Sequence, residues 1–342
     1  MGENGIDCLS TGTGLLQQRV EKGDRKYMNR GQIDRNRVTK VFLLLAITLL
    51  AGSILGCIFP DQEKNIPAQD KVNVMTTTVP LGHFTKMVGK DLVNVEILIS
   101  PGTNPHTFEP VPSQLKCIDE AQLYVKNGAG MEIWMDKIIQ ANEDMLVVDS
   151  SKGIDLIEST DPDHDDHNDN SEKGLHKAIL TKDPHIWLSP RNAMVQVENI
   201  CDGLVNVDPE NEDRYRNNRD SYIKELEKLD SDLNATFSKS EKKKILVLHP
   251  AWSYFARDYG LEQISILYSK KEPGLRYLVA MIETARKNNV TRIFVDPNFN
   301  PKSAEIIANE IGGKVVPLDP LAENYVENMR HVGQEIATSF EP

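Results

Sequence analysis

Three histidines and one aspartate stand where a fold could use them to hold a metal ion. His106, His185, His249 and Asp319 each end or follow an extended segment, and each has a proline next to it. Three imidazoles and one carboxylate form the donor set of a tetrahedral or slightly expanded site for a first-row metal, zinc above all. One histidine in a loop carries little information, whereas four residues in the same setting predict a shared metal site.

The stretch around His185 is the most informative of the four. It reads Asp183-Pro-His-Ile-Trp-Leu188. Pro184 biases the residue before it toward an extended backbone, and Pro190 suits the first turn of a following helix. His185 is therefore expected at a loop or strand end, shortly before a helix begins.

An acidic run that contains two histidines precedes this stretch. Residues 161–170 hold His164 and His167, and His176 follows. The run predicts either a weak secondary metal site, which captures or senses the ion, or a solvated acidic loop. The residues leave both interpretations open.

Other polar residues compete with the four candidates. Asp296 is a rival to Asp319, because it too follows a predicted strand and precedes a proline. His83 and His331 fall within predicted helices, where a structural or exposed role is expected.

The composition is that of a globular protein with an acidic surplus. The chain has 342 residues, 39% hydrophobic and 26% charged, with a formal net charge of −12. Residues 1–56 hold eight Lys/Arg and five Asp/Glu, which leaves −15 for the rest. Such an acidic body argues against nucleic acid as a partner and is compatible with a cation as ligand. The spacing of the four cysteines is typical of neither a CxxC zinc pair nor a disulfide framework.

Residues 1–56 are expected to be a secretory leader rather than part of the mature fold. Arg35, Arg37 and Lys40 precede an apolar stretch at 41–50, and small residues follow up to Cys57. This ending resembles the lipobox at which prolipoproteins are cleaved and acylated, so Cys57 is the predicted lipidation site. The alternative is an uncleaved membrane anchor, because about 18 apolar residues could just span a bilayer. In both cases we expect an exported protein, anchored to the outer face of the cytoplasmic membrane.

The leader is long, and Met28 is an alternative to Met1 as the first residue of the precursor. Residues 57–70 are mainly polar and are predicted to form a flexible tether.

Strands and helices alternate along the rest of the chain, which predicts an α/β fold with mainly parallel sheets. Two lobes are expected, at 71–210 and 241–342, each with a sheet flanked by helices. In such sheets ligands bind beyond the carboxyl ends of the strands, where the candidate ligands lie. The predicted strands are 72–79, 93–99, 123–125 and 145–148 in the first lobe, and 244–248, 263–268, 292–295 and 314–318 in the second.

A single long helix is predicted between the lobes. Over residues 212–237, Tyr215, Tyr222, Leu226 and Leu229 recur at helical intervals, and no proline or glycine interrupts the run. At 1.5 Å per residue this helix would be about 40 Å long. We therefore expect residues 211–240 to join the lobes as a rigid strut.

The chain resembles the metal-specific solute-binding proteins of ABC importers, the zinc/manganese family, from about residue 72 to its end. The resemblance implies two α/β lobes joined by one long helix, with the metal clamped between them. It implies His106 and His185 as ligands from the first lobe, and His249 and Asp319 from the second. The segments that carry it are Pro101-Gly-Thr-Asn-Pro-His106 with Glu109-Pro110, Asn127-Gly128 with Glu132, Asp183 to Leu188, the helix after Asp208-Pro209, His249, Glu272-Pro273 and Asp319-Pro-Leu321.

The resemblance also implies a function, which is capture of Zn²⁺ outside the membrane and delivery to the membrane subunits of an ABC permease. In this family a carboxylate at the third ligand position accompanies manganese preference, whereas histidine there accompanies zinc. His249 therefore favours Zn²⁺, because imidazole suits zinc better than manganese; Mn²⁺ or Fe²⁺ is the alternative. The acidic run resembles the mobile loop of the zinc-selective members, although it holds fewer histidines. A monomer is expected.

Two other classes of function compete with this interpretation. A zinc hydrolase usually keeps three protein ligands, an open water position and a nearby base. Four protein donors would close that shell, and the sequence contains no HExxH pairing, so we do not expect an enzyme. The other class is a surface adhesin, since some lipoproteins of this fold bind host molecules.

Overall fold

The computed structural model describes residues 71–159, 182–240, 244–267 and 273–341. Contacts divide the chain into residues 1–69 and 70–342, and all the described elements belong to the second unit. The predicted leader, the tether, Cys57 and the acidic run with His164 and His167 lie outside the described residues. Within those ranges, none of the helices has the length and apolarity needed to cross a membrane.

The first lobe is built on a parallel four-stranded sheet in the order β2-β1-β3-β4. Its central strands are buried on both faces, as β-branched strands are when helices cover both sides of a sheet. Helix α2 packs on β1 and β2, and α6 packs on β3 and β4. The elements are β1 (Val72–Thr76), α2 (Val79–Gly89), β2 (Val93–Ile97), α3 (Pro112–Asp119), β3 (Leu123–Lys126), α4 (Met135–Ala141), β4 (Leu146–Asp149) and α6 (Pro190–Val207).

The second lobe repeats this arrangement with the order β6-β5-β7-β8, again all parallel. Helix α10 packs on β7 and β8, and α8 packs on β6. The expected α/β fold with two parallel sheets is therefore confirmed. The elements are β5 (Lys244–Val247), α8 (Ser253–Tyr259), β6 (Glu262–Ser265), α9 (Leu275–Lys287), β7 (Arg292–Val295), α10 (Lys302–Ile311), β8 (Lys314–Pro317) and α11 (Tyr325–Thr338).

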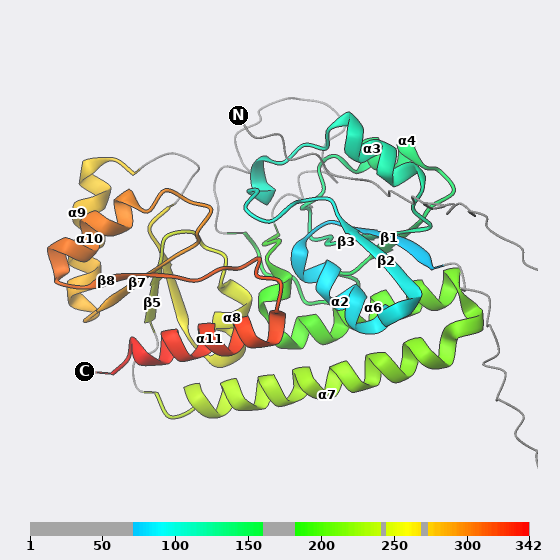
Figure 1. The fold of residues 1–342 in the computed structure, drawn as a ribbon. Helices are drawn as coiled ribbons and strands as arrows, with labels where there is room; N and C mark the ends of the chain where they lie inside the picture. The colour runs from blue at the N-terminus through cyan, green and yellow to red at the C-terminus, as the bar shows by residue number, and fades with distance from the viewer. Residues whose placement is uncertain (1–70, 160–181, 241–243, 268–272, 342) are drawn as a thin grey trace, which may run out of the picture. The chain divides into compact units, whose positions relative to one another are not determined.

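The predicted long helix is α7 (Glu212–Phe237), which runs beside elements of both lobes (Figure 1). It contacts α2 and α6 of the first lobe and α8 and α11 of the second. One stripe of its surface is buried, because its apolar residues recur at intervals of three, four and seven. That stripe consists of Tyr215, Tyr222, Leu226, Leu229, Leu233 and Phe237.

The main hydrophobic core does not stop at the boundary between the lobes. One cluster of buried side chains extends from the first sheet through α7 to β5, α8 and α11 of the second lobe. Phe84 of α2 packs edge-on against Tyr325 of α11, with ring centroids 4.8 Å apart. A smaller second cluster fills the space between the second sheet, α9 and α10. Because the lobes share one core, a wide hinge motion would expose apolar surface to water.

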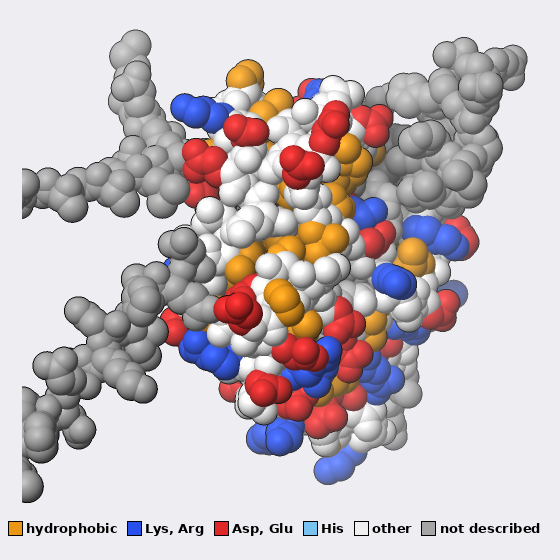
Figure 2. All heavy atoms as spheres, turned by 90° about the vertical axis from the view of Figure 1, so that its right-hand side faces the viewer, with side chains coloured by type: hydrophobic (Ala, Val, Ile, Leu, Met, Phe, Trp, Pro, Cys, Tyr) orange, Lys and Arg blue, Asp and Glu red, His pale blue; other side chains and the backbone are white. Residues whose placement is uncertain are grey.

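The outer face of the molecule carries charges of both signs. Figure 2 shows acidic, basic and apolar side chains interspersed over the face that it displays, with no continuous basic field there. That face therefore has no feature that would attract a polyanion, as the acidic composition of the chain leads one to expect.

The buried stripe of α7 gives a test of the shared core. Leu226→Ala should lower the free energy of unfolding of the metal-free protein by about 2–5 kcal/mol, because it leaves a cavity at a fully buried position. Glu227→Ala, at the exposed neighbouring position, should change it by less than about 0.5 kcal/mol. Urea unfolding followed by circular dichroism measures both. Equal effects of the two changes would show that the stripe does not join the lobes in solution.

Candidate metal centre

The three candidate histidines come from three segments that meet near the carboxyl ends of the strands. His106 lies in a single 3-10 turn, Pro105–Thr107, in the loop after β2. His185 directly precedes another 3-10 turn, Ile186–Leu188. His249 follows β5 by two residues. His106 and His249 lie where the chain leaves β2 and β5, whereas His185 follows an isolated antiparallel bridge between Glu158 and Lys182.

The Nε2 atoms of these histidines form an equilateral triangle. Each of the three pairs of Nε2 atoms is separated by 3.2 Å. His185 and His249 are buried, with 6% and 8% of their surfaces exposed, and His106 is half-buried. Among the described residues, this is the group of His, Cys, Asp and Glu side chains that could hold a metal ion.

Hydrogen bonds between the three rings cannot account for this arrangement of nitrogen atoms. A neutral imidazole nitrogen either carries a hydrogen or offers a lone pair, yet each Nε2 lies within hydrogen-bonding distance of two others. Two facing nitrogens that both offer lone pairs repel, and two that both carry hydrogens clash. A cation between the three nitrogens accepts all three lone pairs at once, so the geometry is that of a metal site.

The size of the triangle fits zinc. The corners of a triangle with 3.2 Å edges lie about 1.85 Å from its centre. The three nitrogens are therefore close enough together for one ion at the ordinary zinc–imidazole distance of about 2.0–2.1 Å to contact all of them at once. A tetrahedral ion held by these three ligands would accept one further donor.

Asp183 orients the imidazole of His185. Its Oδ1 accepts hydrogen bonds from the backbone N–H of His185, at 3.0 Å, and from Nδ1 of the same residue, at 2.7 Å. Since a carboxylate only accepts, the hydrogen of the ring is on Nδ1 and the lone pair is on Nε2, which faces the other histidines.

The other two rings are held by a stacking contact and by a local cap. The ring of His249 stacks on Phe299, with centroids 4.5 Å apart and planes 17° apart. The side chain of Asn104 accepts a hydrogen bond from the backbone N–H of His106 at 2.9 Å. Burial lowers the pKa of His249 well below the usual histidine range, and the neighbouring rings of His185 and His106 lower it further.

A turn of the first lobe supports the segment that carries His185. The side-chain amide of Asn127 donates to the carbonyl of Pro184 at 2.9 Å. Glu132 in turn accepts hydrogen bonds from the backbone N–H groups of Asn127 and Gly128, at 2.6 and 3.0 Å. Burial raises the pKa of the Glu132 carboxyl. Gly128 has φ +77°, and a Cβ there would lie 2.2 Å from Oδ1 of Asp149, so only glycine fits this turn.

The two rival aspartates lie near the histidines but outside the group whose ligand atoms are all within 4.8 Å of one another. Burial, with a smaller contribution from the charge of Asp319, raises the pKa of Asp296 to about 6, while the hydrogen bond from the backbone of Asn298 and the nearby His185 oppose the shift. Asp319 is half-buried, and its Oδ1 accepts a hydrogen bond from the backbone N–H of Leu321 at 2.8 Å. Three of the four residues predicted as ligands thus converge, and metal binding by these three and by Asp319 stays a prediction.

The remaining histidines of the described chain lie in helices, as expected. His83 is half-buried in α2 and contacts the ring of Tyr222, and His331 is exposed on α11. The supporting roles of Phe299 and Glu132 were not predicted, because no periodicity or spacing marks a residue that acts through its neighbour. The carboxylate that orients His185 had one signal in the sequence, the run Asp183-Pro184-His185.

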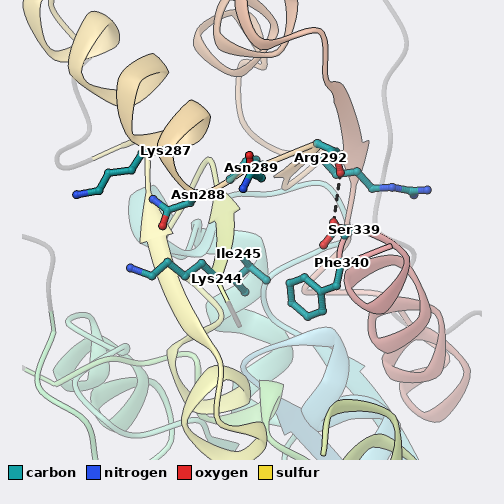
Figure 3. A pocket seen from close by; sticks show the side chains of 10 residues that line it. Lys244, Ile245, Lys287, Asn288, Asn289, Arg292, Ser339 and Phe340 are labelled. Carbon is teal, nitrogen blue, oxygen red and sulfur yellow. Dashed lines mark hydrogen bonds between the residues drawn. The ribbon is translucent and has the colours of Figure 1, made fainter. Parts of the chain in front are cut away.

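A cavity at the opposite end of the second sheet does not compete as a functional site. Its volume is about 280 Å³, and the side chains of Lys244 and Lys287 lie at its rim (Figure 3). Lys244 is neutralised by Glu262 at 2.9 Å, and Arg292 turns away to pair with Glu335 at 2.5 Å. No candidate metal ligand lines this cavity.

Together these features define a two-lobed parallel α/β protein with a candidate metal centre formed by three histidines. Comparisons with known proteins identify its family. A family model described as "ZnuA: Zinc-uptake complex component A periplasmic" matches residues 74–339. The chain belongs to this family.

Two relatives share most of the described fold. The chain is 36% identical over 256 residues to the high-affinity zinc uptake system protein ZnuA of Bacillus subtilis (strain 168), covering 74% of this chain and 79% of that protein. A crystal structure of ZnuA superposes with a TM-score of 0.74 and 38% identity, covering 80% of this chain and all of the other.

The names of two further relatives mention a lipoprotein and an adhesin. The zinc-binding lipoprotein AdcA of Streptococcus pneumoniae (strain ATCC BAA-255 / R6) is 32% identical over 306 residues, covering 88% of this chain; this chain spans 59% of the length of AdcA. The laminin-binding protein Lmb of Streptococcus agalactiae is described as bifunctional, with adhesin and metal-transporting activity. It superposes with a TM-score of 0.68 at 28% identity, covering 80% of this chain and all of Lmb.

The lowered pKa of His249 predicts how stability depends on pH. Below the ordinary histidine pKa the unfolded chain binds a proton at this residue and the folded chain does not, so stability is lost as the pH falls. Between about pH 7.5 and about pH 5.5, the metal-free His249→Gln variant should therefore lose less of its melting temperature than the wild type. His331→Gln, at an exposed position, is the control.

Differential scanning calorimetry in the presence of a chelator measures these midpoints. An equal loss in the wild type and in His249→Gln would contradict the shift assigned to His249. Asp296 is present in both proteins, so the opposite contribution of its raised pKa cancels from the comparison.

Proposed function

We propose that this protein captures Zn²⁺ outside the cytoplasmic membrane and delivers it to the membrane subunits of an ABC importer. The observation that carries the proposal is the triangle of Nε2 atoms of His106, His185 and His249, with its 3.2 Å edges. Neutral imidazoles favour Zn²⁺ over Mn²⁺, which prefers oxygen donors. Membership of the zinc-uptake family supports the same ion, and Mn²⁺ or Fe²⁺ is the second choice.

We assign the domains as the sequence predicts them. Residues 1–56 are the leader, 57–70 the tether, 71–210 and 241–342 the two metal-binding lobes, and 211–240 the connecting segment. In this scheme Cys57 carries the lipid, and the name of AdcA as a lipoprotein supports that assignment. His164 and His167 form a weak secondary site that raises the local concentration of metal.

We propose binding and release, rather than catalysis, as the role of the centre. The arrangement holds an ion between protein ligands and leaves one further position, which Asp319 fills in this proposal. Adhesion to a host molecule is a second activity that the description of Lmb suggests. Zinc capture comes first, because it rests on an observation in this chain.

A metal titration tests the proposal. The full chain, stripped of metal, should bind one Zn²⁺ tightly and Mn²⁺ far more weakly, as measured by competition with a chromogenic chelator. His249→Ala should weaken zinc binding by at least about a hundredfold, because it removes one of three converging ligands. His331→Ala should bind like the wild type, since this histidine is exposed on α11. Tighter binding of Mn²⁺ would contradict zinc as the cargo, and the absence of a tight site would contradict the centre itself.

A second titration identifies the fourth donor. Asp319→Asn should weaken zinc binding by about tenfold, whereas Asp296→Asn should have a smaller effect, because its carboxylate is disfavoured by burial. The reverse order of the two variants would assign the fourth position to Asp296. Unchanged affinity in both would leave the position to water or to another donor.

A further inference from the structure

His185 belongs to the first lobe in sequence, but two tyrosines of the second lobe hold the segment that carries it. The hydroxyl of Tyr254, in α8, donates to the carbonyl of Asp183 at 2.8 Å. The hydroxyl of Tyr325, the first residue of α11, donates to the carbonyl of Trp187 at 2.7 Å. These two carbonyls lie two residues before and two residues after His185.

A third contact joins the same segment to the second lobe. The indole Nε1–H of Trp187 donates to the carbonyl of Pro320 at 2.7 Å, and Pro320 directly follows Asp319. The ring of Trp187 lies beside that of His185, with centroids 5.5 Å apart. Tyr254, Tyr325 and Trp187 are almost completely buried, so water does not replace these bonds while the fold is intact.

Tyr254 also makes a second bond, which fixes its hydroxyl. It accepts a hydrogen bond from the backbone N–H of Ile157 at 3.1 Å, while Asp183 donates its own N–H to the carbonyl of Ile157 at 2.9 Å. The hydroxyl therefore lies between two first-lobe segments and completes their pairing. Helix α8 begins four residues after His249. One short piece of the second lobe thus contains one histidine of the centre and supports the segment of another.

Metal affinity depends on the placement of such ligands to within a fraction of an ångström. Asp183 sets the orientation of the His185 ring, and Tyr254 sets the position of the Asp183 backbone. On the other side, Tyr325 fixes the backbone of Trp187. A shift of either end of this segment would move Nε2 of His185 out of the triangle.

We propose that the hydroxyls of Tyr254 and Tyr325 are positioning groups for His185, which hold the segment from Asp183 to Trp187 against the second lobe and so fix the spacing of His185 and His249. The proposal rests on the proposed function, because it assumes that the triangle binds zinc. Neither hydroxyl touches the ion.

The test removes each hydroxyl and keeps the ring. Tyr254→Phe and Tyr325→Phe, made in the full chain, should each bind Zn²⁺ about tenfold more weakly than the wild type in competition with a chelator. With Co²⁺ in place of zinc, the visible absorption bands should shift or lose intensity, because they report the geometry of the ligands. The double variant should lose less than about a hundredfold, since both hydroxyls hold one segment.

Tyr259→Phe is the matched control. Tyr259 is buried and lies in α8, as Tyr254 does. Its hydroxyl donates to Oδ1 of Asp230 at 3.0 Å and not to the segment that carries His185. This variant should lose thermal stability without metal, as the others do, and should keep the zinc affinity and cobalt spectrum of the wild type.

The outcomes separate this proposal from the function on which it rests. Wild-type zinc affinity and cobalt spectra in both Tyr254→Phe and Tyr325→Phe would overturn it and leave the hydroxyls a purely structural role. Failure of the wild type to bind zinc would instead overturn the proposed function. If one tyrosine variant does not fold, the other tests the same segment, and wild-type zinc affinity and cobalt spectrum in that variant would also overturn the proposal.

Discussion

Three imidazole nitrogens converge on one point, and the rest of the structure must hold them there. Atoms that offer lone pairs repel one another at 3.2 Å unless a cation lies between them. In a metal-free chain, only the surrounding packing and hydrogen bonds hold them there. His185 and His249 are buried, and burial together with mutual repulsion keeps the pKa of His249 low. His249 is thus neutral near neutral pH, and its lone pair is available to a cation.

The fold supplies that packing by joining its two sheets. Helix α7 contacts both lobes, and the main core runs from β1 to α11 without a break. Hydrogen bonds across the lobes reach backbone carbonyls close to His185, because Tyr254 donates to Asp183 and Tyr325 donates to Trp187. A centre made by segments of both lobes therefore depends on a body that deforms little, which agrees with the expectation of a rigid strut.

Much of this architecture was predictable from local patterns. The bounds of α7 follow from an uninterrupted helical periodicity, and the strands from β-branched runs between turns. The three histidines were predicted because each was expected to end or follow an extended segment and has a proline next to it. Helix α4 begins only at Met135, because Gly128, Ala129 and Gly130 have positive φ and Glu132 binds the backbone of that turn.

The finer parts of the centre depend on long-range contacts that no local pattern encodes. Tyr254 lies 71 residues from Asp183 in sequence, and the sequence pattern of its helix indicates only burial. The relation of Asp319 to Asp296 is similar, since both follow a strand and precede a proline. Burial distinguishes them, because Asp296 is buried and Asp319 is half-buried, and burial exists only in the folded chain.

X-ray absorption at the zinc K edge tests the central claim most directly. The full chain, loaded with one equivalent of Zn²⁺, should show three imidazole nitrogens at about 2.0–2.1 Å and one further light donor. The His106→Ala variant should show two imidazoles. A zinc shell with sulfur, one with fewer than three imidazoles in the wild type, or three imidazoles that persist in His106→Ala would contradict the convergence of His106, His185 and His249 on a single ion.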